Sequence, residues 1–496
     1  GGARGAMDFD DLEDAEVDNV QAEADRAEEE FKEYYKVLQP YYFSHKDCEP
    51  LRMGVLSTAS IIHTGIVGPC MKSPQAAEIV GIASRSQEQA TAVQGFVPGL
   101  KNAKVYPTYQ DLLDEPSIDC IYNPLPNGLH YEWTKKALEA GKHVLLEKPF
   151  TANAEEARLL VELARKKNLV LMEAAHWYYH PVRARLLEMI QSGIIGKVQE
   201  IDFRFRLKMG LPPVCLKRAG TFDTNSDSGK MWIMRRGMAG GLTMTLGTYD
   251  LNIIRTMIGE EPNITWSEGT CLADDDQMDA IMKAELYFPK SGIKGFFEAG
   301  GMGPEEHHNE MLIKGSEGTL ATSDLMEPQY VPNRITVTDT EGTELSSQCC
   351  SVSGGGHTTY DLQLLAFVDH VRQVQAGECA ADSFPHTGDD NIRQMEVIDQ
   401  VYGNAGMRPR WGWSGIVPKL RWEVAAKAGA AAHKSNDEKS SSLGKLGSGA
   451  VVEGPLEDHG WLHFKKISGS GPDSGWVNVR GKESPALKPV PLHGDA

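Results

Sequence analysis

A carboxylate and an amine stand side by side at the end of a short apolar run. Val144-Leu145-Leu146 is bounded by Gly141 and Pro149, which is typical of a buried strand. Glu147 and Lys148 follow the run directly, before a proline that cannot continue the strand's hydrogen bonding. Ligands of open α/β sheets bind outside the carboxyl ends of strands, so Lys148 is placed where a ligand would lie. A surface Lys-Pro turn fits these residues equally well, but their position after several βα units favours function.

The elements that would position this lysine begin at residue 51. Residues 51–56 and 78–83 are predicted strands, joined by a small-residue turn over 57–60 and a helix from Ile61. In this arrangement the helix N-terminus suits a phosphate, because its free N–H groups and its dipole face the turn. The glycine fingerprint is degraded, so a βαβ unit without a ligand is an equal alternative. The candidate cofactor contacts in the turn are Gly54, Ser57, Thr58 and Ala59.

The end of the second strand favours one cofactor over another. An NAD site usually has an acidic residue here that binds the ribose 2′-hydroxyl. This chain has Ser84-Arg85-Ser86 instead, which offers a guanidinium and hydroxyls to a phosphate and no carboxylate to repel it. We therefore expect NADP in preference to NAD. The alternative is that Arg85 is only a solvated charge at the end of a strand.

A third strand is predicted over 119–122, and a rigid loop over 123–128 follows it at the same edge of the sheet. An amphipathic helix over 132–140 comes next and ends at Gly141. Further candidate cofactor contacts in this region are Pro124, Asn127 and His130, with a helix-start role as the alternative for His130.

Composition limits the class of protein. The chain has 496 residues, which predicts two or three domains, and its formal net charge of −19 argues against nucleic acid or an anionic membrane as partner. Eight cysteines without a C-x-x-C pair favour reduced thiols. No apolar run is long enough to span a bilayer and no signal peptide is visible, so we expect a cytoplasmic protein; the first residue is not Met, which leaves open a missing targeting segment.

Several motifs resemble one family of enzymes. They are Asn127-Gly-Leu-His130, Ala140-Gly-Lys-His-Val-Leu-Leu-Glu-Lys-Pro149, Glu173-Ala-Ala-His-Trp-Tyr-Tyr-His-Pro181, Ser192-Gly-Ile-Ile-Gly-Lys-Val198, Gly240-Gly-Leu-Thr-Met-Thr-Leu-Gly-Thr-Tyr249 and Asp399-Gln-Val-Tyr-Gly-Asn-Ala-Gly406. From residue 51 to about 410, the chain resembles the Gfo/Idh/MocA oxidoreductases, and within them the dihydrodiol dehydrogenase and NADP-dependent D-xylose dehydrogenase branch. The motifs recur in order, which is far more specific than any one of them.

The resemblance implies a Rossmann domain followed by an α/β domain with an open, mainly antiparallel sheet. The sequence agrees independently, because residues 198–207 alternate apolar and polar side chains as a half-buried strand does. Further strands are predicted over 280–288, 293–297, 310–313 and 334–337. Helices predicted over 360–374 and 391–405 would pack back across the domains.

The resemblance also implies roles for individual residues. Lys148 would lie near the substrate hydroxyl and the nicotinamide, beside the cofactor contact Glu147, and Tyr249 would be the acid/base. Two departures stand out, because Thr245 and Tyr178 occupy positions where the family has an aspartate and an arginine. The remaining candidate substrate contacts are Trp177 and His180, with a packed structural histidine as the alternative for His180.

Two functions follow from these expectations. The first is an NADP-dependent dehydrogenase that acts on a hydroxyl of a sugar or cyclic vicinal diol, without a metal. The second is a dinucleotide-binding regulatory or scaffold protein with weakened turnover, which Thr245 and Tyr178 favour. The resemblance makes a homodimer the expected assembly.

The two ends of the chain differ from its middle. Residues 1–48 are rich in Ala, Asp and Glu and predict a disordered or partly helical tail. Short strand-like pieces with Gly and Trp over 420–485 resemble a bacterial SH3-like β-barrel, in which Trp461 and Trp476 either line a groove for an unknown ligand or pack in the core. The expected domains are 49–172, with the Rossmann fold, 173–412, for substrate and dimerisation, and 420–485.

Overall fold

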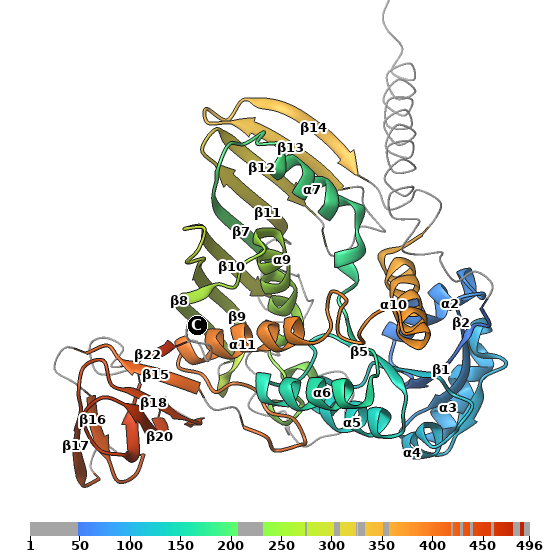
Figure 1. Cartoon of the computed structure of the whole chain (residues 1–496), viewed down its shortest axis with the longest axis horizontal. Helices are drawn as coiled ribbons and strands as arrows, with labels where there is room; N and C mark the ends of the chain where they lie inside the picture. The colour runs from blue at the N-terminus through green and yellow to red at the C-terminus, as the bar shows by residue number, and fades with distance from the viewer. Residues whose placement is uncertain are drawn as a thin grey trace, which may run out of the picture.

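The computed structural model contains three β-sheets in sequence order (Figure 1). The predicted N-terminal tail lies outside the described part of the chain except for Cys48. Among the described residues, no helix has the length and apolarity needed to cross a membrane. The structure describes residues 48–206, 232–272, 275–301, 308–323, 325, 333–350, 357–417, 420–426, 430–436, 440–457, 461–479 and 487–490.

The first sheet has six parallel strands in the order β3-β2-β1-β4-β5-β6. This is the Rossmann order, and it reverses direction between β1 and β4. The four predicted strands correspond to β1, β2, β4 and β5 and are confirmed with small differences at their ends, whereas β3 and β6 were not predicted. The strands are β1 (Leu51–Leu56), β2 (Ala77–Ala83), β3 (Lys104–Tyr106), β4 (Cys120–Asn123), β5 (His143–Glu147) and β6 (Leu171–Ala174).

The helices between these strands cover both faces of the sheet. Their ends follow local capping rules: Asn153 begins α6 by accepting hydrogen bonds from two main-chain N–H groups, and Asn168 ends it in the left-handed conformation at φ 52°. The helices and helical turns are η1 (His63–Val67), α2 (Gly68–Lys72), α3 (Gln87–Phe96), η2 (Pro98–Leu100), α4 (Tyr109–Leu113), η3 (Asn127–Leu129), α5 (His130–Glu139) and α6 (Ala154–Lys167).

The second sheet has eight strands in the order β14-β13-β12-β11-β7-β10-β9-β8. Within the described residues, β7 and β10 are its only parallel neighbours, so the expected mainly antiparallel sheet is confirmed. Its strands are β7 (Val198–Arg206), β8 (Asn263–Leu272), β9 (Asp275–Tyr287), β10 (Lys294–Gly300), β11 (His308–Gly315), β12 (Gly318–Ser323), β13 (Asn333–Asp339) and β14 (Glu344–Cys350).

Helices from distant parts of the chain tie the two sheets together. Helix α10 (Thr359–Ala376) packs its apolar side chains against β1, β4 and α2, on one face of the first sheet. Helix α11 (Asp389–Asn404) contacts α6, α9 (Thr248–Ile258) and β8. Both helices were predicted, and both pack back across the sheets as expected (Figure 1). Two short helical segments, η4 (His176–Tyr179) and α7 (Pro181–Gln191), connect β6 to β7.

The third sheet has its own apolar core and contacts α11 through Leu420 and Trp422, which lie against Gly403. Its strands run in the order β17-β16-β21-β20-β18-β15-β22, with β19 beside β20. The sheet is antiparallel. No pairing joins β17 to β22 among the described residues, so closure into a barrel is not observed there. The strands are β15 (Leu420–Val424), β16 (Ala430–His433), β17 (Ser442–Leu446), β18 (Val451–Gly454), β19 (Leu456–Glu457), β20 (Trp461–Ser468), β21 (Ser474–Asn478) and β22 (Leu487–Val490).

The two tryptophans singled out in this sheet have different environments. Trp461 is buried, with its ring edge-on to His433. Trp476 is half-buried and stacks on the exposed His463, with ring centroids 4.5 Å apart. Core packing therefore accounts for Trp461, while Trp476 lies at the surface.

Candidate active site

Lys148 lies at the carboxyl end of β5, whose residues are all buried. Its Nζ donates a hydrogen bond to the main-chain oxygen of Thr245 at 2.9 Å and lies 4.6 Å from the centroid of the Tyr249 ring. Burial lowers the pKa of Lys148, and the carboxyl groups of Glu147 and Glu173 oppose this shift. The structure thus brings together Lys148 and Tyr249, which are 101 positions apart in the sequence.

Tyr249 is held in the first turn of α9. Its Oη lies 3.3 Å from Nε2 of His176, and Nδ1 of the same imidazole lies 2.9 Å from Oγ1 of Thr359. Tyr360 stacks on the imidazole at a centroid distance of 4.1 Å. Burial and the nearby Lys148 lower the pKa of His176 to about 3, so the ring is neutral. A neutral imidazole has one donor and one acceptor nitrogen, so it can pass a proton between the tyrosine and the threonine.

Two buried carboxyl groups lie beside the lysine. Glu147 accepts a hydrogen bond from Oη of Tyr122 at 2.6 Å, and burial raises its pKa. Glu173 is also buried, its Oε1 has no hydrogen-bond partner among the described residues, and burial raises its pKa to about 8. At neutral pH Glu173 is therefore mostly protonated, which weakens its opposition to the lowered pKa of Lys148.

Thr245, at the position where the resemblance implies an aspartate, lies within the π-helical turn η8 (Thr243–Gly247). Its hydroxyl donates to the main-chain oxygen of Gly241 at 2.9 Å, so the side chain is bonded within its own turn. Its carbonyl, rather than a carboxylate, accepts the hydrogen bond from Lys148. The lysine therefore meets a neutral dipole instead of a negative charge.

The predicted cofactor contacts of the first turn lie together at the carboxyl ends of β1 and β2. Oγ of Ser57 accepts the N–H of Ala59 at 2.9 Å, and the hydroxyls of Thr58 and Ser84 lie 3.4 Å apart. Arg85 is exposed beyond the end of β2. These groups provide hydroxyls, a main-chain turn and a cation, and no carboxylate lies between residues 84 and 86.

Gly54 serves packing in this structure. A Cβ at this position would lie 2.6 Å from Leu112 and 3.0 Å from Ile121. A glycine that sequence analysis did not single out, Gly65, lies against the strand, because a Cβ there would come within 2.5 Å of Oη of Tyr122. Close helix–strand packing is one of the reasons for glycine in a dinucleotide fingerprint.

The loop candidates are engaged by the protein itself. Asn127 donates to the main-chain oxygen of Ala239 at 3.2 Å, and Pro124 is buried. His130 lies between the carbonyl oxygens of Leu125 and Pro149, at 2.7 and 2.9 Å from its two ring nitrogens. Burial lowers the pKa of His130 to about 4, so the ring is neutral and its single N–H donates to one of these two oxygens. The ring connects the loop to the Glu-Lys-Pro motif.

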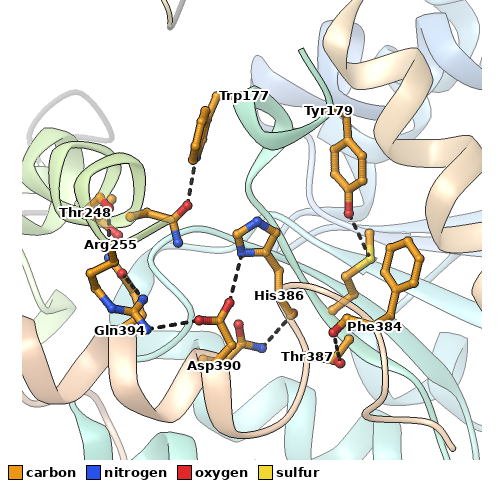
Figure 2. A network of polar contacts seen from close by, with 12 residues as sticks. Trp177, Tyr179, Thr248, Arg255, Phe384, His386, Thr387, Asp390 and Gln394 are labelled. Atoms are coloured by element: carbon orange, nitrogen blue, oxygen red, sulfur yellow. Dashed lines mark hydrogen bonds and ion pairs between the residues drawn. The ribbon is translucent and has the colours of Figure 1, made fainter. Parts of the chain in front are cut away.

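The aromatic segment after β6 anchors the site. Trp177 donates from its indole N–H to Oδ1 of Asn252 on α9 at 2.8 Å (Figure 2). His180 begins α7, where its Nδ1 accepts the N–H of Val182 at 2.8 Å. Both residues have structural partners, and Nε2 of His180 is buried without a partner among the described residues.

A polar network fixes the helix that carries Tyr249. Arg255 on α9 binds Asp390 and Gln394 on α11, and Gln394 donates to the main-chain oxygen of Thr248 at 2.8 Å (Figure 2). Nδ1 of His386 lies 3.5 Å from the carboxylate of the same Asp390. Because Thr248 precedes Tyr249, this network sets the position of the tyrosine relative to Lys148.

Sequence analysis missed His176 and Glu173, although both stand in a motif that carried the resemblance. No cluster of potential metal ligands occurs in the part of the chain that the structure describes.

Comparison with known proteins extends over the first two sheets. Residues 53–175 match the model of the Gfo/Idh/MocA oxidoreductase family with an NAD-binding Rossmann fold, and residues 184–321 match that of the Gfo/Idh/MocA C-terminal domain. The chain is 30% identical over 320 residues to a D-xylose 1-dehydrogenase (NADP(+)) from Hypocrea jecorina, which covers 61% of this chain and 79% of that protein. It is 26% identical over 273 residues to a trans-1,2-dihydrobenzene-1,2-diol dehydrogenase from Danio rerio, covering 54% of this chain and 73% of that protein.

A solved structure shares the fold. It is a 3-ketoreductase from Actinomadura kijaniata in complex with NADP and TDP-benzene, at a TM-score of 0.60 and 22% identity. The match covers 72% of this chain and 98% of that one.

Proposed function

Since this chain belongs to the Gfo/Idh/MocA family of oxidoreductases, we propose that it transfers a hydride between NADP and a hydroxyl-bearing carbon of a sugar or cyclic vicinal diol. The observation that carries the proposal is the contact of Lys148 with Tyr249 at the carboxyl end of β5. Relatives named as D-xylose and dihydrodiol dehydrogenases support this substrate class.

The residues at the ends of β1 and β2 fit NADP. The cofactor, when bound, supplies or accepts the hydride. Ser57, Thr58 and Ala59 would hold its pyrophosphate at the start of the helix, and Ser84 with Arg85 would hold the 2′-phosphate. A relative named as an NADP(+)-dependent enzyme supports this choice over NAD.

Proton transfer falls to groups of this chain. Oxidation of a hydroxyl releases a proton, and the buried Tyr249 is placed to exchange it with Nε2 of His176, 3.3 Å away. The ammonium of Lys148, whose pKa burial lowers, would polarise the substrate oxygen.

A second function is a dinucleotide-binding scaffold with weakened turnover. The bonding of Thr245 within its own turn favours it, because no carboxylate contacts Lys148 through this position. The intact contact of Lys148 with Tyr249 opposes it.

The arrangement of the whole protein forms part of the proposal. We propose domains over 49–172, 173–412 and 420–485, with the last an SH3-like module that binds an unknown ligand near Trp476. A cytoplasmic homodimer is the proposed assembly, and light scattering that finds only monomer would rule it out.

The deciding experiment follows absorbance of the reduced nicotinamide. The wild type is incubated with NADP or NAD and a panel of pentoses, hexoses and cyclic diols, beside the variants Lys148→Met and Lys135→Met. Lys135 is an exposed lysine of α5 and serves as the matched control. NADP-dependent turnover that K148M loses and K135M keeps supports the enzyme, whereas NADP binding without turnover of any substrate favours the scaffold.

A further inference from the structure

Arg183 lies at the start of α7, with its guanidinium carbon 3.8 Å from the centroid of the Tyr178 ring. Tyr178 is the residue that stands where the family has an arginine. The positive charge missing from position 178 is therefore present on the face of its ring, supplied from five residues further along the chain. A guanidinium stacked on an aromatic ring is held in a defined plane while its N–H groups remain able to bind.

The guanidinium has unused donors. Arg183 is half-buried, and its Nε is buried without a hydrogen-bond partner among the described residues. Leaving a buried donor without an acceptor costs free energy, so a bound acceptor is the expected complement. The neighbouring arginine of the same helix differs, because Arg185 bonds Glu188 at 2.7 Å and Gln348 at 2.9 Å.

No carboxylate forms an ion pair with Arg183 among the residues that the structure describes. Asp390 lies close enough to Tyr178 for its charge to raise the pKa of that tyrosine. Its carboxylate, however, forms an ion pair with Arg255 at 3.0 Å and lies 3.5 Å from His386. His386, whose ring lies edge-on to Tyr178 at 4.5 Å, is buried, and burial lowers its pKa to about 4. It is therefore uncharged at neutral pH and does not repel the guanidinium of Arg183.

The location connects this cation to the proposed reaction. Tyr178 belongs to the same 3-10 turn as His176, which contacts Tyr249. His180, between Tyr178 and Arg183 in the chain, is 2% exposed and has an unpartnered Nε2. Because its Nδ1 accepts the N–H of Val182, this Nε2 carries the proton and is a second unused donor.

We propose that Arg183, stacked on Tyr178, is an anion-binding subsite that selects substrates bearing a carboxylate or phosphate group. This inference rests on the proposed function, and it narrows the substrate from a neutral sugar or diol to an acidic derivative. A planar guanidinium binds either oxyanion through paired N–H groups, so both sources share one chemistry.

The test measures binding by calorimetry to the full chain saturated with NADP. The probes are D-glucose, which is neutral, D-glucuronate, which carries a carboxylate, and D-glucose 6-phosphate. We expect one of the two acidic sugars to bind the wild type at least about tenfold more tightly than glucose, since charge-assisted hydrogen bonds are the strong ones. The tighter of the two identifies the anion.

The matched variants are Arg183→Met and Arg185→Met. R183M should lose the preference for the acidic sugar, whereas R185M should keep it, because Arg185 is already engaged by Glu188 and Gln348. If the thermal unfolding curve shows that R183M does not fold, Arg183→Gln is used in its place. Equal binding of all three sugars to the wild type, or an unchanged preference in the Arg183 variants, overturns the proposal.

Failure of the proposed function gives a different result. In that case the acidic sugar binds and R183M abolishes its preference, but the absorbance assay shows no turnover with any substrate. Turnover of neutral sugars alone, with no preference for the acids, leaves the oxidoreductase intact and removes the anion subsite.

Discussion

The ammonium of Lys148 and the main-chain oxygen of Thr245 are joined by a hydrogen bond of 2.9 Å. The partner of the ammonium is thus a neutral peptide carbonyl and not a carboxylate. Because a neutral dipole stabilises the ammonium less than a carboxylate does, burial can lower the pKa of Lys148 more effectively. Position 245 thus gives Lys148 a neutral partner through its main chain.

Restoring the acidic residue should reverse this tuning. In Thr245→Asp a carboxylate near Lys148 favours the charged form, so its pKa should rise by about one unit or more. Because the ammonium is the form proposed to polarise the substrate oxygen, the fall of kcat/KM at high pH should move upward by the same amount. Thr245→Ser, which keeps the hydroxyl, is the control. A pH profile that is identical in all three proteins would show that Lys148 is not the titrating group.

Tyr249→Phe should separate proton transfer from cofactor binding. The variant keeps the ring beneath Lys148 but removes the Oη that contacts His176. Loss of a positioned acid/base lowers kcat by about a hundredfold or more. NADP affinity, measured by fluorescence titration, should stay within about twofold. The exposed Tyr287→Phe is the control, and a kcat that falls equally in both variants would contradict the assigned role.

Arg85 should set the choice between the two dinucleotides. Arg85→Ala removes the cation proposed for the 2′-phosphate, so the Kd for NADP should rise by about tenfold or more while that for NAD changes little. Lys104→Ala, which removes an exposed charge from the adjacent β3, is the control. An equal loss of affinity for both cofactors would place Arg85 elsewhere in the site.

The sequence predicted those elements whose pattern is local. Strand β5 shows a short apolar run, and α10 and α11 show helical spacing over many residues, so their existence needed no knowledge of distant partners. Strands β8, β12 and β14 were not predicted. β8 and β14 carry exposed polar residues, and the strand pairing of all three outweighs a weak local preference.

The site was predictable only in part for the same reason. Lys148 and Tyr249 stand in recognisable motifs, but His176 gains its importance from Thr359, 183 positions away. The role of Arg183 likewise depends on the ring of Tyr178, which sequence analysis treated as a lost charge. Contacts that form only on folding leave no spacing in the sequence.

Breaking the buried ion pair between Asp279 on β9 and Arg410 should lower the free energy of unfolding. Asp279 and Arg410 are both fully buried and in contact at 2.5 Å, and Asp279 also accepts the N–H of Thr243. Asp279→Ala leaves the guanidinium buried without its partner, so unfolding by urea should show a loss of about 3–5 kcal/mol. The exposed pair of Glu200 with Lys314 gives the control, since Glu200→Ala should cost less than about 1 kcal/mol. Similar losses in both variants would contradict the argument.

The pH dependence of stability should reflect histidines that are buried in the neutral form. Burial lowers the pKa of His143 from its ordinary value of 6.5 to about 4, and its Nδ1 accepts the N–H of Val170 at 3.0 Å. Below pH 6.5 the unfolded chain binds a proton that the folded protein does not take up until about pH 4. The contribution of His143 to stability is therefore complete above pH 6.5 and is lost as the pH falls through this window.

His143→Asn tests this directly, because an amide oxygen can replace Nδ1 as the acceptor but does not titrate. Urea unfolding between pH 7.5 and 4.5 should show a shallower loss of stability in H143N than in the wild type. The slope of the free energy of unfolding against pH should be smaller by the equivalent of about one proton. His463→Asn changes an exposed histidine and should leave the slope of the wild type unchanged. An equal slope in H143N and the wild type would mean that His143 is protonated in the folded protein as readily as in the unfolded chain.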